Sequence, residues 1–156
     1  MEKKFELTDK FVFNTFGIKL FQIKCTKSFK YAKEGDLGGY VEKDENLDQE
    51  SNAWVSGNAQ VYGDARVSGD AQVSGNADIE NDNNHCGFDC FGSCNRHTHA
   101  YLTKDNKVEI TCGCFRGSIE EFEKKVEKTH SGKIYEKQYK AIINAIKIKF
   151  GLTDLI

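Results

Sequence analysis

A six-residue repeat in the middle of the chain constrains the fold more than any other feature. From Glu50 the sequence reads ESNAWV, SGNAQV, YGDARV, SGDAQV and SGNADI, and the common template is X-Gly-Asn/Asp-Ala-X-Val. The Ala and Val positions are two residues apart, so both side chains point to the same side of an extended strand. The Gly-Asn and Gly-Asp pairs accept turn backbone at low cost. The unit is therefore a short strand followed by a corner, and a chain without proline fits corners made by glycine.

Hexads of this kind resemble those of the left-handed parallel β-helix, in which three hexads form one coil of about 18 residues. Residues about 18 apart should then stack, such as Val55 with Val73 and Val61 with Ile79. Together with two degenerate hexads before them, the repeats make roughly two coils, which bury too little apolar area to be stable alone. We therefore predict a mainly β fold with C-terminal helices, built as a short left-handed parallel β-helix (residues 34–83) that is capped by an N-terminal β-hairpin (1–33) and a C-terminal α+β module (84–156).

The two flanks show their own patterns. Apolar residues alternate with polar ones on both sides of residues 14–17, which predicts two strands joined as a hairpin. A second pair of strands is predicted around the polar turn 104–107. Ser118 and Glu121 form a capping box that predicts the start of a helix. An apolar stripe from Tyr135 to Phe150, closed by Gly151, predicts a last helix.

Charge is distributed unevenly along the chain. The formal net charge is −2, but residues 1–33 hold eight Lys against three acids, and residues 34–82 hold twelve acids against Lys43 and Arg66. Residues 83–156 hold twelve bases against nine acids. The acidic middle segment is interpreted either as a solvated face or as a surface that meets a basic partner. Its charge disfavours direct nucleic-acid binding by the repeat.

Six cysteines and four histidines raise the question of a metal site. The candidate zinc ligands are Cys86, Cys90, Cys94 and His97, because a zinc site takes four Cys or His ligands at short spacings. Cys112 and Cys114 alternate on a predicted strand and should point to opposite faces, which is poor for shared ligation. Reduced, partly buried thiols are the favoured interpretation over zinc or a disulfide, so we predict no metal and no cofactor.

No catalytic residue is predicted. Cys114 with His130 offers a nucleophile and a base, but nothing supplies a third group to orient them. No apolar run approaches the ~18 residues of a membrane span, and the N-terminus lacks a signal-peptide pattern. We therefore expect a soluble, intracellular protein with no membrane contact.

Several motifs resemble a group of phage and prophage proteins with hexapeptide repeats. The stretch GDLGGYVE at 35–42 and the hexads resemble their first part, and the run TCGCFRG at 111–117 with Thr129-His130 resembles a second module often appended to it. The resemblance covers nearly the whole chain and implies a phage-encoded protein of the host bacterial cytoplasm. Such modules have Gly-Ser-Arg where this chain has Gly92-Ser93-Cys94, which argues against Cys94 as a shared metal ligand.

Together these observations predict a non-enzymatic binding protein. We expect an inhibitor of a host defence system, such as an anti-CRISPR, that contacts a host protein, for example a nucleic-acid-binding effector, through an acidic surface. One alternative is a structural or self-assembling phage protein that forms a homo-oligomer. Another is a reduced hexapeptide-repeat acyltransferase, although the repeats hold no His to act as general base. The predicted contact residues, which should project from the repeat unless Trp54 packs beneath a flank, are Trp54, Tyr62, Asp64, Arg66, Asp70 and Asp78.

Overall fold

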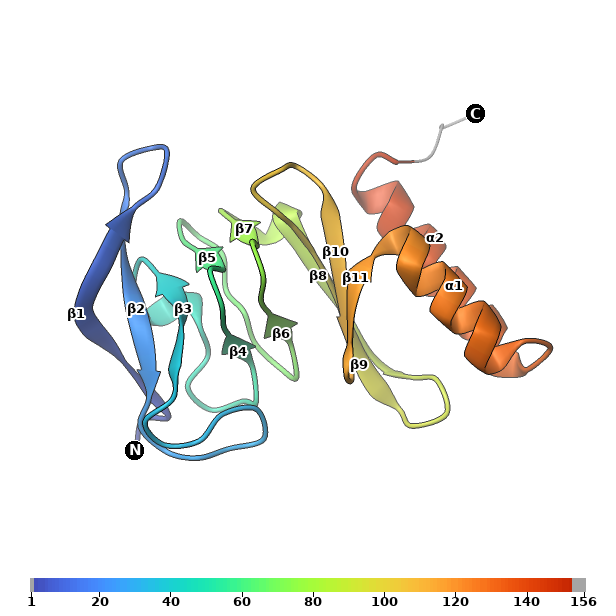
Figure 1. Cartoon of the computed structure of the whole chain (residues 1–156), viewed down its shortest axis with the longest axis horizontal. Helices are drawn as coiled ribbons and strands as arrows, with labels where there is room; N and C mark the ends of the chain where they lie inside the picture. Colours follow the sequence, from blue (N-terminus) through green and yellow to red (C-terminus); the bar gives the residue numbers. More distant parts are fainter. Residues whose placement is uncertain (1, 153–156) are drawn as a thin grey trace.

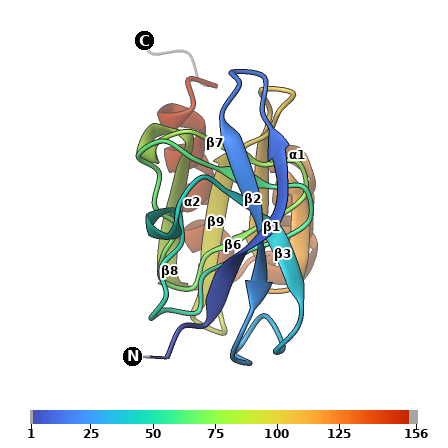
Figure 2. The ribbon, with the colours of Figure 1, turned by 90° about the vertical axis from the view of Figure 1, so that its left-hand side faces the viewer.

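The computed structural model describes residues 2–152, and the parts of the chain follow one another along its long axis (Figure 1). The N-terminal hairpin lies at one end, the repeat follows, and a second sheet separates the repeat from two helices at the other end. Figure 2 looks along this axis, with the hairpin in front of the repeat. Residues 1 and 153–156, the latter within the predicted C-terminal module, lie outside the described residues.

The first sheet joins the N-terminal flank to the repeat. The predicted hairpin is present as β1 (Phe5–Phe13) and β2 (Lys19–Cys25), and β2 pairs antiparallel with β3 (Leu37–Val41). Two strands of the repeat, β5 (Gln60–Val61) and β7 (Asp78–Ile79), extend the sheet in parallel, in the order β1-β2-β3-β5-β7. The repeat is therefore continuous with the hairpin through backbone hydrogen bonds.

The remaining repeat strands form a small parallel sheet of β4 (Trp54–Val55) and β6 (Gln72–Val73). Its register pairs Val55 with Val73, and the first sheet pairs Val61 with Ile79, so the predicted stacking of these residues is confirmed. Alanines and branched side chains of the repeat, with Phe5, Ile23 and Tyr101 from the flanks, fill one buried core. The inward period of two therefore describes the packing of the hexads correctly.

The predicted fold class, a short left-handed parallel β-helix capped by flanks, is wrong. The assigned strands form three sheets. The longest strand pairs, which are β1–β2, β2–β3 and the pairs of the four-stranded sheet in the C-terminal module, are antiparallel. The repeat supplies only two-residue strands, which join the hairpin sheet or pair with one another. Short hexads give the backbone few ladder bonds, so the longer flanking strands determine the sheet topology.

One corner of the repeat depends on a buried amide. Asn46 ends the short 3₁₀ helix η1 (Asp44–Asn46), and its Nδ2 donates to the carbonyl oxygens of Gly63 at 3.3 Å and Ala65 at 2.8 Å. Its Oδ1 accepts from the Lys43 amide at 3.0 Å. Gly63 has a φ of 60°, and a Cβ there would collide with the Glu80 backbone. The Asn46 hydrogen bonds and the close approach of Gly63 to Glu80 thus connect three successive layers of this corner.

The C-terminal module is an antiparallel sheet covered by two helices. The sheet order is β11-β10-β9-β8, and helices α1 and α2 lie against one of its faces (Figure 1). Ser118 caps α1, and its Oγ accepts from the Glu121 amide at 3.1 Å, so the predicted capping box is confirmed. A 3₁₀ helix, η2 (Asp82–Asn84), connects the repeat to this module. The elements are β8 (His85–Phe91), β9 (Arg96–Leu102), β10 (Val108–Cys112), β11 (Phe115–Ser118), α1 (Ile119–His130) and α2 (Ile134–Lys149).

The four-stranded sheet of the C-terminal module contributes one face to each of two hydrophobic cores. Along β9, Ala100 packs with the helices, whereas the next residue, Tyr101, packs with the repeat. Thr111 of β10 donates from Oγ1 to the Gln72 carbonyl oxygen at 2.7 Å, which ties the same face to the repeat. Within residues 2–152, no helix is both long and apolar enough to cross a membrane.

Candidate functional site

The two aromatic residues predicted to project from the repeat are buried. Trp54 packs edge-on against Phe29 with the ring centroids 5.4 Å apart, and only 6% of it is exposed. Tyr62 is also buried, and its hydroxyl donates to Asp78 Oδ1 at 2.8 Å. The prediction that these two rings project from the repeat is therefore wrong, because both are buried.

The other predicted contact residues differ in their exposure and in the polar contacts that they make. Asp64 and Arg66 are exposed, but the Arg66 guanidinium pairs with Asp48 at 3.2 Å. Asp70 is half-buried and accepts from Asn52 Nδ2 at 3.1 Å. The structure does not bring the six residues together as one exposed patch.

A different set of acids lies along one edge of the repeat. The Gly63 amide donates to Glu42 Oε1 at 2.9 Å, and the Arg66 amide donates to Asp82 Oδ1 at 3.3 Å, so the corners of successive layers lie side by side. The side chains on these corners carry an excess of negative charge. We call them the acidic edge: Glu42, Asp44, Glu45, Asp48, Asp64, Glu80 and Asp82.

The candidate zinc ligands do not converge. Cys86 is half-buried, Cys90 and Cys94 are exposed, and His97 is hydrogen-bonded to Asp89 and to His99. Among residues 2–152 no group of three or more His, Cys, Asp or Glu side chains is arranged to hold a metal ion. Burial raises the pKa of the Cys86 thiol, which disfavours the thiolate that a metal would need.

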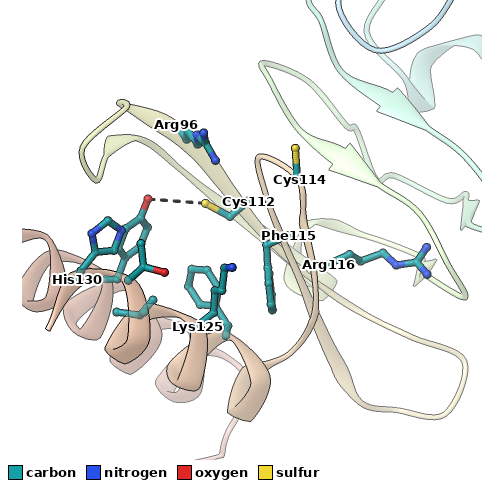
Figure 3. Close-up of a pocket in the computed structure, with 11 residues that line it drawn as sticks. Arg96, Cys112, Cys114, Phe115, Arg116, Lys125 and His130 are labelled. Carbon is teal, nitrogen blue, oxygen red and sulfur yellow. Dashed lines mark hydrogen bonds between the residues drawn. The ribbon is translucent and has the colours of Figure 1, made fainter.

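A cavity of about 480 Å³ in the C-terminal module brings together residues that are distant in the sequence (Figure 3). We call it the C-terminal cavity. Strands β9 to β11 form one side of it, and α1 and α2 form the other. Its volume lies within the range of about 300–1,000 Å³ that is usual for small-molecule sites.

The deep side of the C-terminal cavity carries weak hydrogen-bonding groups. The Tyr139 hydroxyl lies 3.8 Å from Cys112 Sγ, and Thr98 Oγ1 donates to the same sulfur at 3.3 Å. Burial raises the pKa of Tyr139, and the Cys112 thiol adds to the rise. The Tyr139 hydroxyl therefore stays protonated at neutral pH and is available as a donor.

Aromatic rings form its walls. Phe122 packs against Tyr139 with the centroids 5.6 Å apart and against Phe115 at 5.1 Å. His130, at the end of α1, stacks on Tyr139 at 5.5 Å with an interplanar angle of 24°. Phe122 and Tyr139 are buried, so the half-buried Phe115 and His130 are the rings that can offer apolar surface to a ligand.

The charge around the C-terminal cavity is positive. Arg96, Arg116 and Lys125 line it, and no Asp or Glu of the described residues does. Arg116 pairs with Glu109 at 3.6 Å and points away in Figure 3, whereas Arg96 and Lys125 form no ion pair within residues 2–152. A Cβ at Gly113 would collide with the Arg96 guanidinium, so this glycine leaves room for that side chain.

The geometry gives no support to a cysteine nucleophile. In Figure 3 the Cys114 sulfur points away from the helix that carries His130. Cys112 is the thiol near the deep side, but its neighbours are the hydroxyls of Thr98 and Tyr139, not a base. The arrangement is suited to binding an anion beside a ring.

Sequence reasoning missed the C-terminal cavity. Its polar residues come from the strands β9 to β11 and from α1 and α2, and the motif TCGCFRG holds only those near β10 and β11. The available signals were the basic excess after residue 83 and the glycine in TCGCF. A comparison with known protein families gives no match, and no curated protein sequence matches the chain either.

Proposed function

We propose that this protein is a non-enzymatic binding protein whose C-terminal cavity takes a small ligand that carries an anionic phosphate group next to a planar ring. The observation that carries the proposal is the presence of Arg96 and Lys125, which have no carboxylate partner among residues 2–152, beside a cavity that none of the described acids lines. Clustered cations without counter-charges repel one another, and an anion relieves that repulsion. A guanidinium also suits the geometry of phosphate oxygens.

The aromatic walls favour the ring of such a ligand. Phe115, Phe122 and His130 line the same cavity as the two cations and Tyr139. A planar group would bury apolar area there, and its phosphate would remain near Arg96. The Tyr139 hydroxyl and the Cys112 thiol would supply weak hydrogen bonds.

Calorimetry with AMP, ribose 5-phosphate and adenosine tests both parts. We expect AMP to bind best, because only AMP carries both the phosphate and the ring. Arg96→Gln should weaken AMP binding by roughly tenfold, which is typical for a lost charge-assisted hydrogen bond. Arg116→Gln is the matched control and should have little effect, because Arg116 already pairs with Glu109.

Three results would contradict this proposal. They are equal binding of AMP and adenosine, equal effects of the two arginine variants, and no binding of any probe at millimolar concentration. Circular dichroism of each variant verifies that the fold is retained.

The acidic edge supports a second candidate function. We propose that it contacts a basic protein surface, as expected of a phage-encoded inhibitor of a host defence system. Seven carboxylates on stacked corners, with Arg66 and Lys3 as local counter-charges, can steer a basic partner into contact. Three exposed members, Glu45, Asp64 and Glu80, are the residues to change.

A phage-plating experiment tests this second candidate. Expression of the protein should restore plating of a phage on a host that carries an RNA-guided nuclease. Reversal of Glu45, Asp64 and Glu80 to Lys should abolish the effect. Reversal of Asp105, Glu120 and Glu127, which are exposed on the C-terminal module, should leave it intact. Equal activity of both triple variants would exclude the acidic edge as the contact.

A further inference from the structure

Three histidines form a continuous hydrogen-bonded chain that ends on a carboxylate at each side. His85 Nδ1 lies 2.9 Å from His99 Nε2, and His99 Nδ1 lies 2.9 Å from His97 Nε2. At one end His85 Nε2 lies 2.9 Å from Asp82 Oδ1, and at the other His97 Nδ1 bonds to Asp89 Oδ1. We call this the histidine chain.

The histidine chain lies where the repeat meets the C-terminal module. His85, His97 and His99 stand on the same sheet face as Tyr101, which packs into the repeat core, and Asp82 belongs to the connecting helix η2. Gly87 leaves the space for two of the rings, since a Cβ there would collide with both His97 and His99. His99 is 5% exposed, so its ring nitrogens find partners inside the protein.

The four hydrogen bonds of the histidine chain require four hydrogens on the ring nitrogens. Each carboxylate accepts, so His85 Nε2 and His97 Nδ1 must both carry a hydrogen. Each of the two imidazole–imidazole bonds needs one more, which makes four hydrogens for all four bonds. Three neutral imidazoles carry only three. With three, two lone pairs would face each other across one of the 2.9 Å contacts, which is costly inside a protein.

We infer that the three imidazoles hold one proton in common between Asp82 and Asp89, and that this shared proton locks the junction between the repeat and the C-terminal module. The proton can reside on any of the rings without breaking a bond of the chain. A further proton would set two N–H groups against each other at one of the imidazole–imidazole contacts. Because Asp82 at one end of the histidine chain also accepts from the Arg66 amide of the repeat, loss of these contacts opens the junction on acidification.

The groups around the histidine chain favour a positive charge near its two ends, where Asp82 and Asp89 lie, over one on the central ring. Burial lowers the pKa of His99, and the neighbouring His85 and His97 lower it further, so the central ring is the poorest place for a fixed charge. Lys149 of α2 donates to the Asp82 carbonyl oxygen at 3.4 Å, and the Arg66 amide donates to Asp82 Oδ1. On the same sheet face Tyr101 donates to Glu109 at 2.7 Å. The titratable groups that share a cavity with His97 are Lys30, Tyr31, Asp70, Cys94, Arg96, Cys114 and Arg116.

Nitrogen-15 NMR of the histidine rings tests the shared proton. At pH 7 the ring shifts of His85, His97 and His99 should add up to one imidazolium, and His130, which lies outside the histidine chain, serves as an internal reference. Asp89→Asn should move the loss of the shared proton to a pH lower by about one unit, because one anionic acceptor is gone. Asp105→Asn, an exposed acid in the β9–β10 turn, should move it by much less.

Hydrogen exchange tests the lock. Between pH 7 and 5, after correction for intrinsic rates, protection should fall at junction amides such as Lys104, which donates to the Asn76 carbonyl oxygen. Amides of α1 should keep their protection. His99→Gln can still form hydrogen bonds but carries no charge, so it should remove the pH dependence.

Either half of the inference can be overturned. Three neutral rings at pH 7 that titrate as His130 does would exclude the shared proton. A shared proton with unchanged protection at Lys104 from pH 7 to 5 would exclude the lock.

Discussion

The repeat and the C-terminal module bury their side chains in different ways. The repeat core combines the small alanines and valines of the hexads with Trp54 and with Phe5, Ile23 and Tyr101 of the flanks, and the charged residues of the repeat lie at the corners. The module core combines isoleucines with Phe122 and Tyr139 on longer strands and helices. The hexads therefore present mainly charge at their corners, whereas the larger side chains of the module leave a cavity with polar groups around it.

The largest expected effect on stability comes from truncating one buried side chain in each of the two cores. Ile146→Ala should lower the free energy of unfolding by about 3 kcal/mol, and Val73→Ala by about 2 kcal/mol, because both side chains are fully buried and Ile loses more apolar surface. Trp54, the single tryptophan, reports on the repeat by fluorescence, and circular dichroism reports on the helices. We expect both signals to shift together in each variant. A shift of only one signal would show that the regions unfold separately.

The next effect concerns a polar group of the repeat. Asn46→Ala should lower the free energy of unfolding by about 2 kcal/mol, because the carbonyl oxygens of Gly63 and Ala65 lose their buried donor. Chemical denaturation measures the loss. Asn144→Ala, on the exposed face of α2, is the control and should change little. Similar values for both would mean that water replaces the amide.

pH should distinguish the two regions. The histidine chain holds one proton and takes up a further one only by losing a contact, and burial lowers the pKa of His99, so below about pH 6.5 the unfolded state binds more protons and stability falls by about 1 kcal/mol per pH unit. Burial opposes ionisation of Asp48, but hydrogen bonds and Arg66 lower its pKa overall, so its contribution is lost only below about pH 4. Thermal unfolding from pH 8 to 3 should show both steps. His99→Gln should remove the upper step alone.

The smallest effects involve ion pairs. Lys147→Ala removes the contact with Glu123 between α1 and α2, and Arg66→Ala removes the contact with Asp48 in the repeat. Both should cost less than about 1 kcal/mol, and the Arg66 pair should respond more to salt, because the Arg66 side chain is more exposed than that of Lys147. Denaturation at low and high salt measures this. A loss above about 2 kcal/mol for either would contradict the screening argument.

Much of the local structure could be predicted from the sequence. The period of two placed Val55 and Val73 in one buried row, and the capping box located the start of α1 at Ser118 and Ile119. The fold class could not be predicted in the same way. Pairing between β2 and β3, and between β3 and β5, joins residues far apart in the chain, and a hexad pattern contains no information about which flank will pair with it.

The candidate site could be predicted from the sequence still less well than the fold class. Trp54 and Tyr62 carry the amphipathic rings expected at interfaces, yet Phe29 covers one and Asp78 accepts from the other. Arg96, Lys125 and Tyr139 look like ordinary surface or core residues until three elements converge on one cavity. The sequence by itself determined the inward pattern of the repeat, its acidic corners and the helix ends, because those depend on neighbours within a few residues. Only the tertiary structure decided how the sheets join, where the cations gather and that three histidines form one chain, because hydrogen bonds and charges act across space between residues that the sequence keeps apart.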